Sequence, residues 1–125
     1  MNRIYCFLFF FVLTATFSQQ KNTVIEDDYE TLKDKIRLYF NSSVDRSLVY
    51  AEQMAKSSNY EHLAFANGAM ASILQLKGET DKSKEKYKLA LGYLAKIPDS
   101  KEKKRVTADV YNYGCLLYTS DAADE

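Results

Sequence analysis

Residues 64–97, AFANGAMASILQLKGETDKSKEKYKLALGYLAKI, decide the fold of this chain. Apolar and small residues recur at intervals of three and four on both sides of Gly78, and this pattern is typical of two amphipathic helices, expected over 60–77 and 81–97. The residues expected to be buried are Leu63, Asn67, Met70, Ala71 and Leu74 on the first helix and Tyr87, Ala90, Leu91, Leu94 and Ile97 on the second. Gly78 suits the left-handed turn that ends a helix. The stretch therefore predicts an antiparallel helical hairpin.

Two further helices are expected before this hairpin, over 29–40 and 44–58. Their expected buried residues are Tyr29, Leu32, Ile36, Tyr39 and Phe40 on the first and Ser47, Leu48, Ala51, Met54 and Ala55 on the second. The acidic run at 26–28 favours a helix start because the helix dipole attracts negative charge. Asn41-Ser42-Ser43 ends the first helix and offers caps for the second, and Asn59 is the expected cap of the third.

After Pro98 the charged sequence DSKEKKR, residues 99–105, predicts a solvated linker, and a fifth helix is expected over 106–114. No stretch after the N-terminal apolar run alternates apolar and polar residues as a half-buried strand does. Amphipathic helices joined by short connections pack as hairpins with their neighbours. We therefore expect an all-α fold in which antiparallel hairpins stack as an α-solenoid.

The hairpin at 64–97 resembles a tetratricopeptide repeat, whose period is about 34 residues. Residues 26–58 resemble a degenerate copy, and 106–114 resembles the start of a third repeat; an unrelated helical bundle is the alternative. The positions that match the packing residues of that family are Met70, Ala71, Leu74, Gly78, Ser83, Tyr87, Ala90 and Gly114. Small residues at such positions let helices cross closely.

The resemblance also implies a function. In tetratricopeptide arrays the first helix of each hairpin lines a groove that holds a protein or peptide. Carried over by position, the groove-facing residues here are Phe65, Gly68, Ser72, Gln75, Leu76, Ala108 and Tyr111. The expected partner is a protein or peptide, and the expected function is a non-catalytic interaction module.

The N-terminal segment 1–18 has the pattern of a signal peptide. Arg3 precedes a continuous apolar run from Ile4 to Val12, too short to span a bilayer comfortably. Small residues suit cleavage between Ser18 and Gln19, followed by a short linker at 19–25; an uncleaved anchor is the alternative. The chain is then exported and periplasmic or periplasm-facing. Cleavage removes Cys6, so no disulfide framework is expected.

No residue pattern predicts a catalytic, cofactor or metal site. His62 is the only histidine and is expected to be a solvated surface residue, so a metal site of the ordinary type is not expected. The acidic run at 26–30 lacks the glycine turn of a calcium loop. Basic residues at 101–105 are interrupted by Glu102 and lack aromatic neighbours, which argues against nucleic-acid binding. The 17 basic and 17 acidic side chains balance over the whole chain.

Two settings fit such a module. Gram-negative proteins resembling this one often place degenerate repeats after a signal peptide and before a transmembrane helix and a helix-turn-helix DNA-binding domain, which would make the chain an extracytoplasmic sensor. The alternative is a free periplasmic adaptor with no DNA-binding part.

Residues 115–125, CLLYTSDAADE, resemble codon for codon the translation of a sequencing-library adapter. We therefore expect the native sequence to run only to Gly114 here and to continue differently beyond it.

Overall fold

The computed structural model describes residues 28–123, and that part of the chain contains five helices and no strand. The helices are α2 (Tyr29–Phe40), α3 (Val44–Met54), α4 (Tyr60–Leu76), α5 (Thr80–Ala95) and α6 (Lys101–Ala123). The all-α prediction is confirmed. The expected signal peptide at 1–18 and the linker at 19–25 lie outside the described residues.

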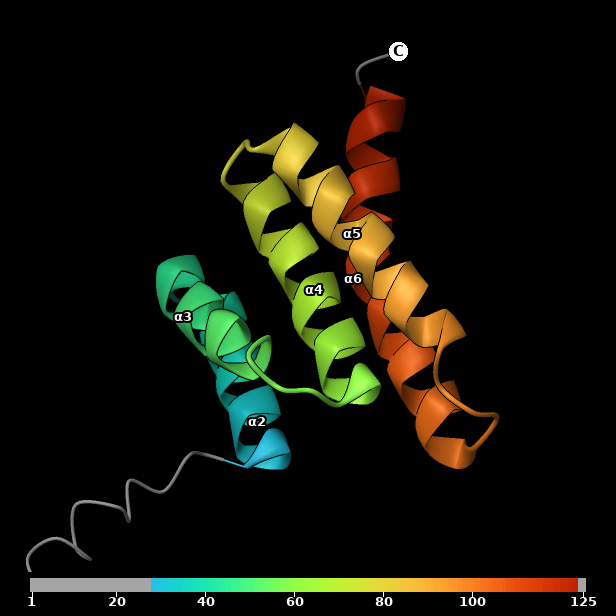
Figure 1. Cartoon of the computed structure of the whole chain (residues 1–125). Helices are drawn as coiled ribbons and strands as arrows, with labels where there is room; N and C mark the ends of the chain where they lie inside the picture. The colour runs from blue at the N-terminus through green and yellow to red at the C-terminus, as the bar shows by residue number, and fades with distance from the viewer. Residues whose placement is uncertain (1–27, 124–125) are drawn as a thin grey trace, which may run out of the picture.

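The helices form two hairpins followed by a single helix. Helices α2 and α3 make the first hairpin and α4 and α5 the second, while α6 packs against both α4 and α5 (Figure 1). Helix α4 lies at the centre, with α3, α5 and α6 all packed on it. Successive helices alternate in direction, so that α2, α4 and α6 run the same way (Figure 1). This is the stacking of hairpins expected for a solenoid.

The central position of α4 makes it the most buried element. The sequence predicts one buried stripe on this helix, but every residue from Ala64 to Leu74 is buried. Small residues at Ala66, Gly68 and Ala69 extend the stripe around the helix, so neighbours can approach from several sides. At Gly68 the approach is close, since an added Cβ would lie 3.3 Å from Cγ2 of Val110 on α6.

Short polar side chains cap the helix starts, and Gly78 ends α4. The Asp28 carboxylate accepts a hydrogen bond from the Thr31 amide at 2.8 Å, and the Asn59 side chain accepts one from the Glu61 amide at 2.8 Å. Gly78 has φ +81°, the left-handed conformation that ends α4. Helix α3 is shorter than predicted and ends at Met54, before the Ser57–Asn59 turn that caps α4.

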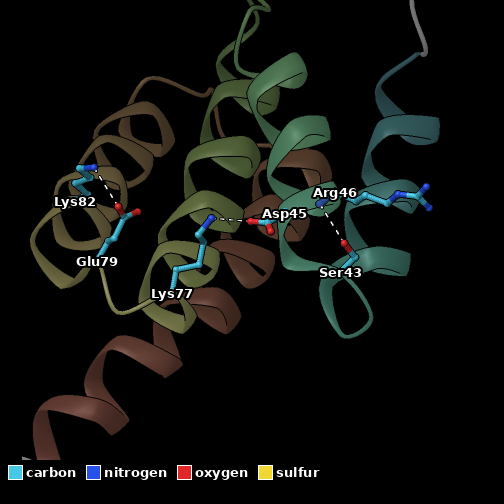
Figure 2. Close-up of polar contacts among 6 residues, drawn as sticks. All are labelled: Ser43, Asp45, Arg46, Lys77, Glu79 and Lys82. Atoms are coloured by element: carbon cyan, nitrogen blue, oxygen red, sulfur yellow. Dashed lines mark hydrogen bonds and ion pairs between the residues drawn. The ribbon is translucent and has the colours of Figure 1, made fainter.

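The two hairpin turns lie at the same edge of the array. Lys77, at the end of α4, forms an ion pair of 2.6 Å with Asp45 in the first turn of α3 (Figure 2). In the same view Ser43 caps α3, and Glu79 pairs with Lys82 at the start of α5. The contact between the Lys77 and Asp45 side chains is exposed and connects one hairpin to the next.

The same hydrogen bond occurs inside both hairpins. Ser47 Oγ on α3 donates to the Ile36 carbonyl on α2 at 2.8 Å, and Ser83 Oγ on α5 donates to the Ala71 carbonyl on α4 at 2.5 Å. Both serines are fully buried. A hydroxyl that reaches the backbone of the facing helix requires the two helices to lie close together. The two hairpins therefore share one packing arrangement at their crossings.

Helix α6 differs from the prediction at both ends. It was expected over 106–114 after a linker at 99–105, but it begins at Lys101 and extends to Ala123. Ser100 caps it, because its Oγ accepts a hydrogen bond from the Lys103 amide at 3.0 Å. Lysine, glutamate and arginine are strong helix formers, so a charged run following a cap continues as helix.

We expect the Ser83→Ala substitution to lower the free energy of unfolding by about 1 kcal/mol, because it removes a buried hydrogen bond between two helices. Urea denaturation followed by circular dichroism measures this change. Ser58→Ala, at an exposed serine before α4, is the control and should leave the midpoint unchanged. Equal midpoints for all three proteins would show that the Ser83 bond contributes nothing.

Candidate partner-binding face

The residues expected to line a groove follow one stripe of α4, but most of that stripe is covered. Phe65 is fully buried, and Ser72 is buried with its Oγ donating to the Tyr113 carbonyl of α6 at 2.6 Å. Gly68 lies against Val110, as described above. Only the last turn of the stripe is open, where Leu76 is 52% exposed. The expectation that Phe65, Gly68 and Ser72 face an open groove is not met, because α6 packs directly on them.

The remaining expected groove residues do not join Leu76 in one surface. Gln75 is half-buried, and its Oε1 accepts no hydrogen bond within the described residues. Ala108 is exposed and Tyr111 is 56% exposed. Both are exposed on α6, whereas Val110, which lies between them in the sequence, is buried against α4, so they do not line one surface with the covered stripe.

The expected packing positions lie inside the array, with one exception. Those that are buried are Met70, Ala71, Leu74, Ser83, Tyr87, Ala90 and Gly114. Gly78 is exposed in the turn between α4 and α5. At Gly114 an added Cβ would lie 2.5 Å from the Tyr87 ring, so the lack of a side chain there lets α6 approach α5.

Side chains from α2, α4 and α6 meet in a group that we call the inner cluster: Tyr29, Lys33 and Arg37 from α2, Phe65 from α4, and Asp109 and Tyr113 from α6. Its ionic part is shared by one carboxylate. Asp109 Oδ1 lies 3.0 Å from Nη2 of Arg37, and Oδ2 lies 3.5 Å from Nζ of Lys33. The Lys33 side chain is only 3% exposed, whereas that of Arg37 is 47% exposed.

The aromatic part of the cluster surrounds Phe65. Its ring meets Tyr29 edge to face at 6.2 Å and Tyr113 at 5.7 Å between centroids. Lys33 Nζ lies 5.3 Å from the centre of the Phe65 ring, and Arg37 Cζ lies 5.6 Å from it. Cations over an aromatic face are attracted by its quadrupole. The two cations and two tyrosines therefore cover the ring that was expected to be open.

Burial also changes the acidity of the two tyrosines. It raises the pKa of Tyr113 to about 12, although the nearby Arg37 guanidinium acts in the opposite direction. Burial, supported by the Glu61 and Asp109 carboxylates, raises the pKa of Tyr29 well above its usual value. Both phenols stay neutral at ordinary pH, so the cluster has two cations and one carboxylate and a net charge of +1.

His62 borders the inner cluster and was wrongly expected to be a solvated surface residue. Its ring stacks on that of Tyr29 at 4.1 Å between centroids, with 9° between the planes. Its Nδ1 lies 2.9 Å from Oγ of Ser57. Burial lowers the pKa of His62 below its usual value. The histidine is therefore an aromatic residue of α4 that packs against Tyr29 of α2.

The described residues contain no group of three or more potential metal ligands, and no helix among them is long and apolar enough to cross a membrane. Two open pockets lie away from the inner cluster. One, of about 500 Å³, lies between the start of α4 at Tyr60 and the α5–α6 connection at Pro98; the other lies on the outer face of α5 around Gly92.

Comparisons with protein-family models, curated proteins and solved structures find no match.

We expect Asp109→Ala to lower the free energy of unfolding by about 1–3 kcal/mol, because it leaves the buried Lys33 without its carboxylate. The double variant Lys33→Met with Asp109→Leu should unfold within about 1 kcal/mol of the parent, since it removes the buried Lys33 charge together with its carboxylate and leaves only the half-exposed Arg37 unpaired. Asp45→Ala breaks the exposed pair with Lys77 and should cost less than about 1 kcal/mol. Urea titrations of the four proteins test this order, and an equal cost for Asp45→Ala and Asp109→Ala would contradict it.

Alkaline pH should destabilise the chain through Tyr113. Folding favours the neutral phenol, so the stability that it contributes is complete below pH 10 and is lost as the pH rises from 10 to about 12. Tyr113→Phe, which cannot ionise, should therefore lose less stability over this range than the parent. Tyr111→Phe, at the exposed tyrosine of α6, is the control and should follow the parent. Urea midpoints measured at several pH values between 9 and 12 give the comparison, and identical curves for the two variants would refute it.

Proposed function

We propose that this chain is a non-catalytic tetratricopeptide-type module that binds a segment of another protein. The observation that carries the proposal is the recurrence of one crossing in two successive hairpins: Ser47 to the Ile36 carbonyl, and Ser83 to the Ala71 carbonyl. A shared crossing is what repeated units require, since each unit packs only against its neighbours. Arrays built in this way present extended surfaces to partner proteins.

The polar groups of the inner cluster favour binding over catalysis. Asp109 faces two cations, and the neutral tyrosines and His62 pack on aromatic rings. A general acid or base needs a pKa near the working pH and a reachable substrate. The pKa of a free tyrosine already lies well above neutrality, and burial raises the pKa of Tyr29 and Tyr113 further. These groups are suited to holding helices together.

The part of the face that we propose for a partner is the open end of the α4 stripe. Leu76 is a large apolar residue, 52% exposed, at the edge where α4 ends. Full burial of an exposed leucine side chain contributes about 1.5–3 kcal/mol, and covering the part of Leu76 that is still exposed contributes about half of that. A partner segment with an apolar anchor would bury Leu76 while the rest of the stripe remains packed under α6.

We propose that the chain is exported. The first setting that we propose is the extracytoplasmic part of a membrane-bound signalling protein with a helix-turn-helix domain. The second is a free periplasmic adaptor. The support is the signal-peptide pattern at 1–18 and the repeat resemblance. Sequencing the native gene beyond the codon of Gly114 separates the two settings. An apolar run of about 20 residues followed by a helix-turn-helix pattern would support the sensor. Further repeats and a stop codon would support the adaptor.

We expect Leu76→Asp to weaken binding of peptides selected from a random display library against the intact chain. A charged side chain in a buried apolar contact should raise the dissociation constant by about tenfold or more, corresponding to about 1.4 kcal/mol. Leu89→Asp is the matched control, because Leu89 is 41% exposed on the outer face of α5. Calorimetry measures both affinities. Peptides that bind Leu76→Asp as tightly as the parent would refute a partner site at the end of α4.

A further inference from the structure

The first hairpin is attached to the rest of the molecule in two unlike ways. Helix α3 packs broadly along α4, whereas α2 contacts α4 and α6 through side chains: those of the inner cluster, the Phe40 ring on Tyr113 and the Tyr29 ring on His62. Two of these contacts are ionic and run from α2 to α6, past α4, which lies between them in the chain order. Asp109 receives both, from Lys33 and from Arg37.

We propose that the contact of Asp109 with Lys33 and Arg37 is an ionic latch that keeps the face formed by α2, α4 and α6 closed. When the latch releases, the α2–α3 hairpin pivots on the α3–α4 contact, the Phe40 ring leaves Tyr113, and the side of Phe65 that α2 covers is exposed. The proposal goes beyond our proposed function, because it concerns access to Phe65 and not the partner site at Leu76. It predicts a movement of the α2–α3 hairpin within the chain that can be measured without a partner.

The latch is built to be reversible. The Tyr29 hydroxyl is buried and forms no hydrogen bond within the described residues, and buried Asp109 Oδ2 has only the 3.5 Å ion pair with Lys33. A buried polar atom without a hydrogen bond costs free energy that solvation on opening recovers. The Arg37 side chain is 47% exposed and that of Asp109 is 22% exposed, so salt can screen their pair. The ionic attraction of Asp109 to Lys33 and Arg37 thus stabilises the closed state, and the cost of burying polar atoms without hydrogen bonds favours opening.

The hinge has a defined place. Residues 55–59 connect α3 to α4, and Ser57 and Asn59 fix this connection to the start of α4. The α4–α5 hairpin and α6 are held together by the buried contacts of Gly68 with Val110 and of Gly114 with Tyr87. Opening therefore separates α2 from α6 while the distances within the remainder stay constant.

Distances between spin labels in the chain with Cys6 and Cys115 replaced by serine test the latch without any partner. One pair joins α2 to α6, through Asp34→Cys and Asn112→Cys, both at exposed positions. A control pair joins α5 to α6, through Lys88→Cys and Asn112→Cys. Each pair is measured in the parent and in Asp109→Asn, which keeps the shape of the side chain and removes its charge.

We expect Asp109→Asn to lengthen and broaden the α2–α6 distance distribution. The control distribution should not change, which also shows that the variant is folded. Raising the salt concentration should shift the parent toward the variant and leave the variant unchanged. An unchanged α2–α6 distribution in Asp109→Asn overturns the latch, and so does an equal broadening of both pairs. Neither result bears on peptide binding at Leu76, so the two proposals fail separately.

Discussion

The close approach of neighbouring helices to α4 is the constraint on which the structure depends. Three helices pack on α4, and the alanines and glycine of residues 64–71 allow them to approach it closely. The closeness is visible in the Ser83 hydroxyl, which reaches the Ala71 carbonyl of the facing helix. Hydrogen bonds to backbone carbonyls across helices are strict in distance, so they hold each crossing in one geometry.

Dense packing around α4 also explains why the inner cluster is mixed. Phe65 is the one large ring on the side of α4 that faces α2 and α6, and it must be covered by side chains long enough to reach it. Lysine and arginine do this by laying their apolar stems along a surface while their charged ends find a partner. Asp109 provides that partner from α6. The same lysine and arginine side chains therefore cover the Phe65 ring and pair with the Asp109 carboxylate.

The sequence predicted what depends on nearby residues. Gly78 and the cap at Asn59 act within one turn of the chain, and the hairpin around them formed as expected. The start of α6 was misplaced because the charged run after Ser100 was interpreted by its charge and not by its helix propensity. Lys33 and His62 were missed since their burial depends on α6 and α2, which lie far away in sequence. The one available signal was Lys33 itself, a charge placed between Leu32 and Ile36 on an apolar stripe.

The order of the contacts along the chain has a consequence for how the protein folds. Each hairpin joins helices that adjoin in sequence, and closing such short loops costs little entropy. Arg37 and Asp109 lie 72 residues apart, so their pairing waits until both hairpins and α6 are in place. Folding should then proceed from α4 and α5 outward, with the hairpins forming rapidly as local contacts do. We therefore expect the contact between α2 and α6 to be the last to form on the folding pathway and the first to be lost on unfolding.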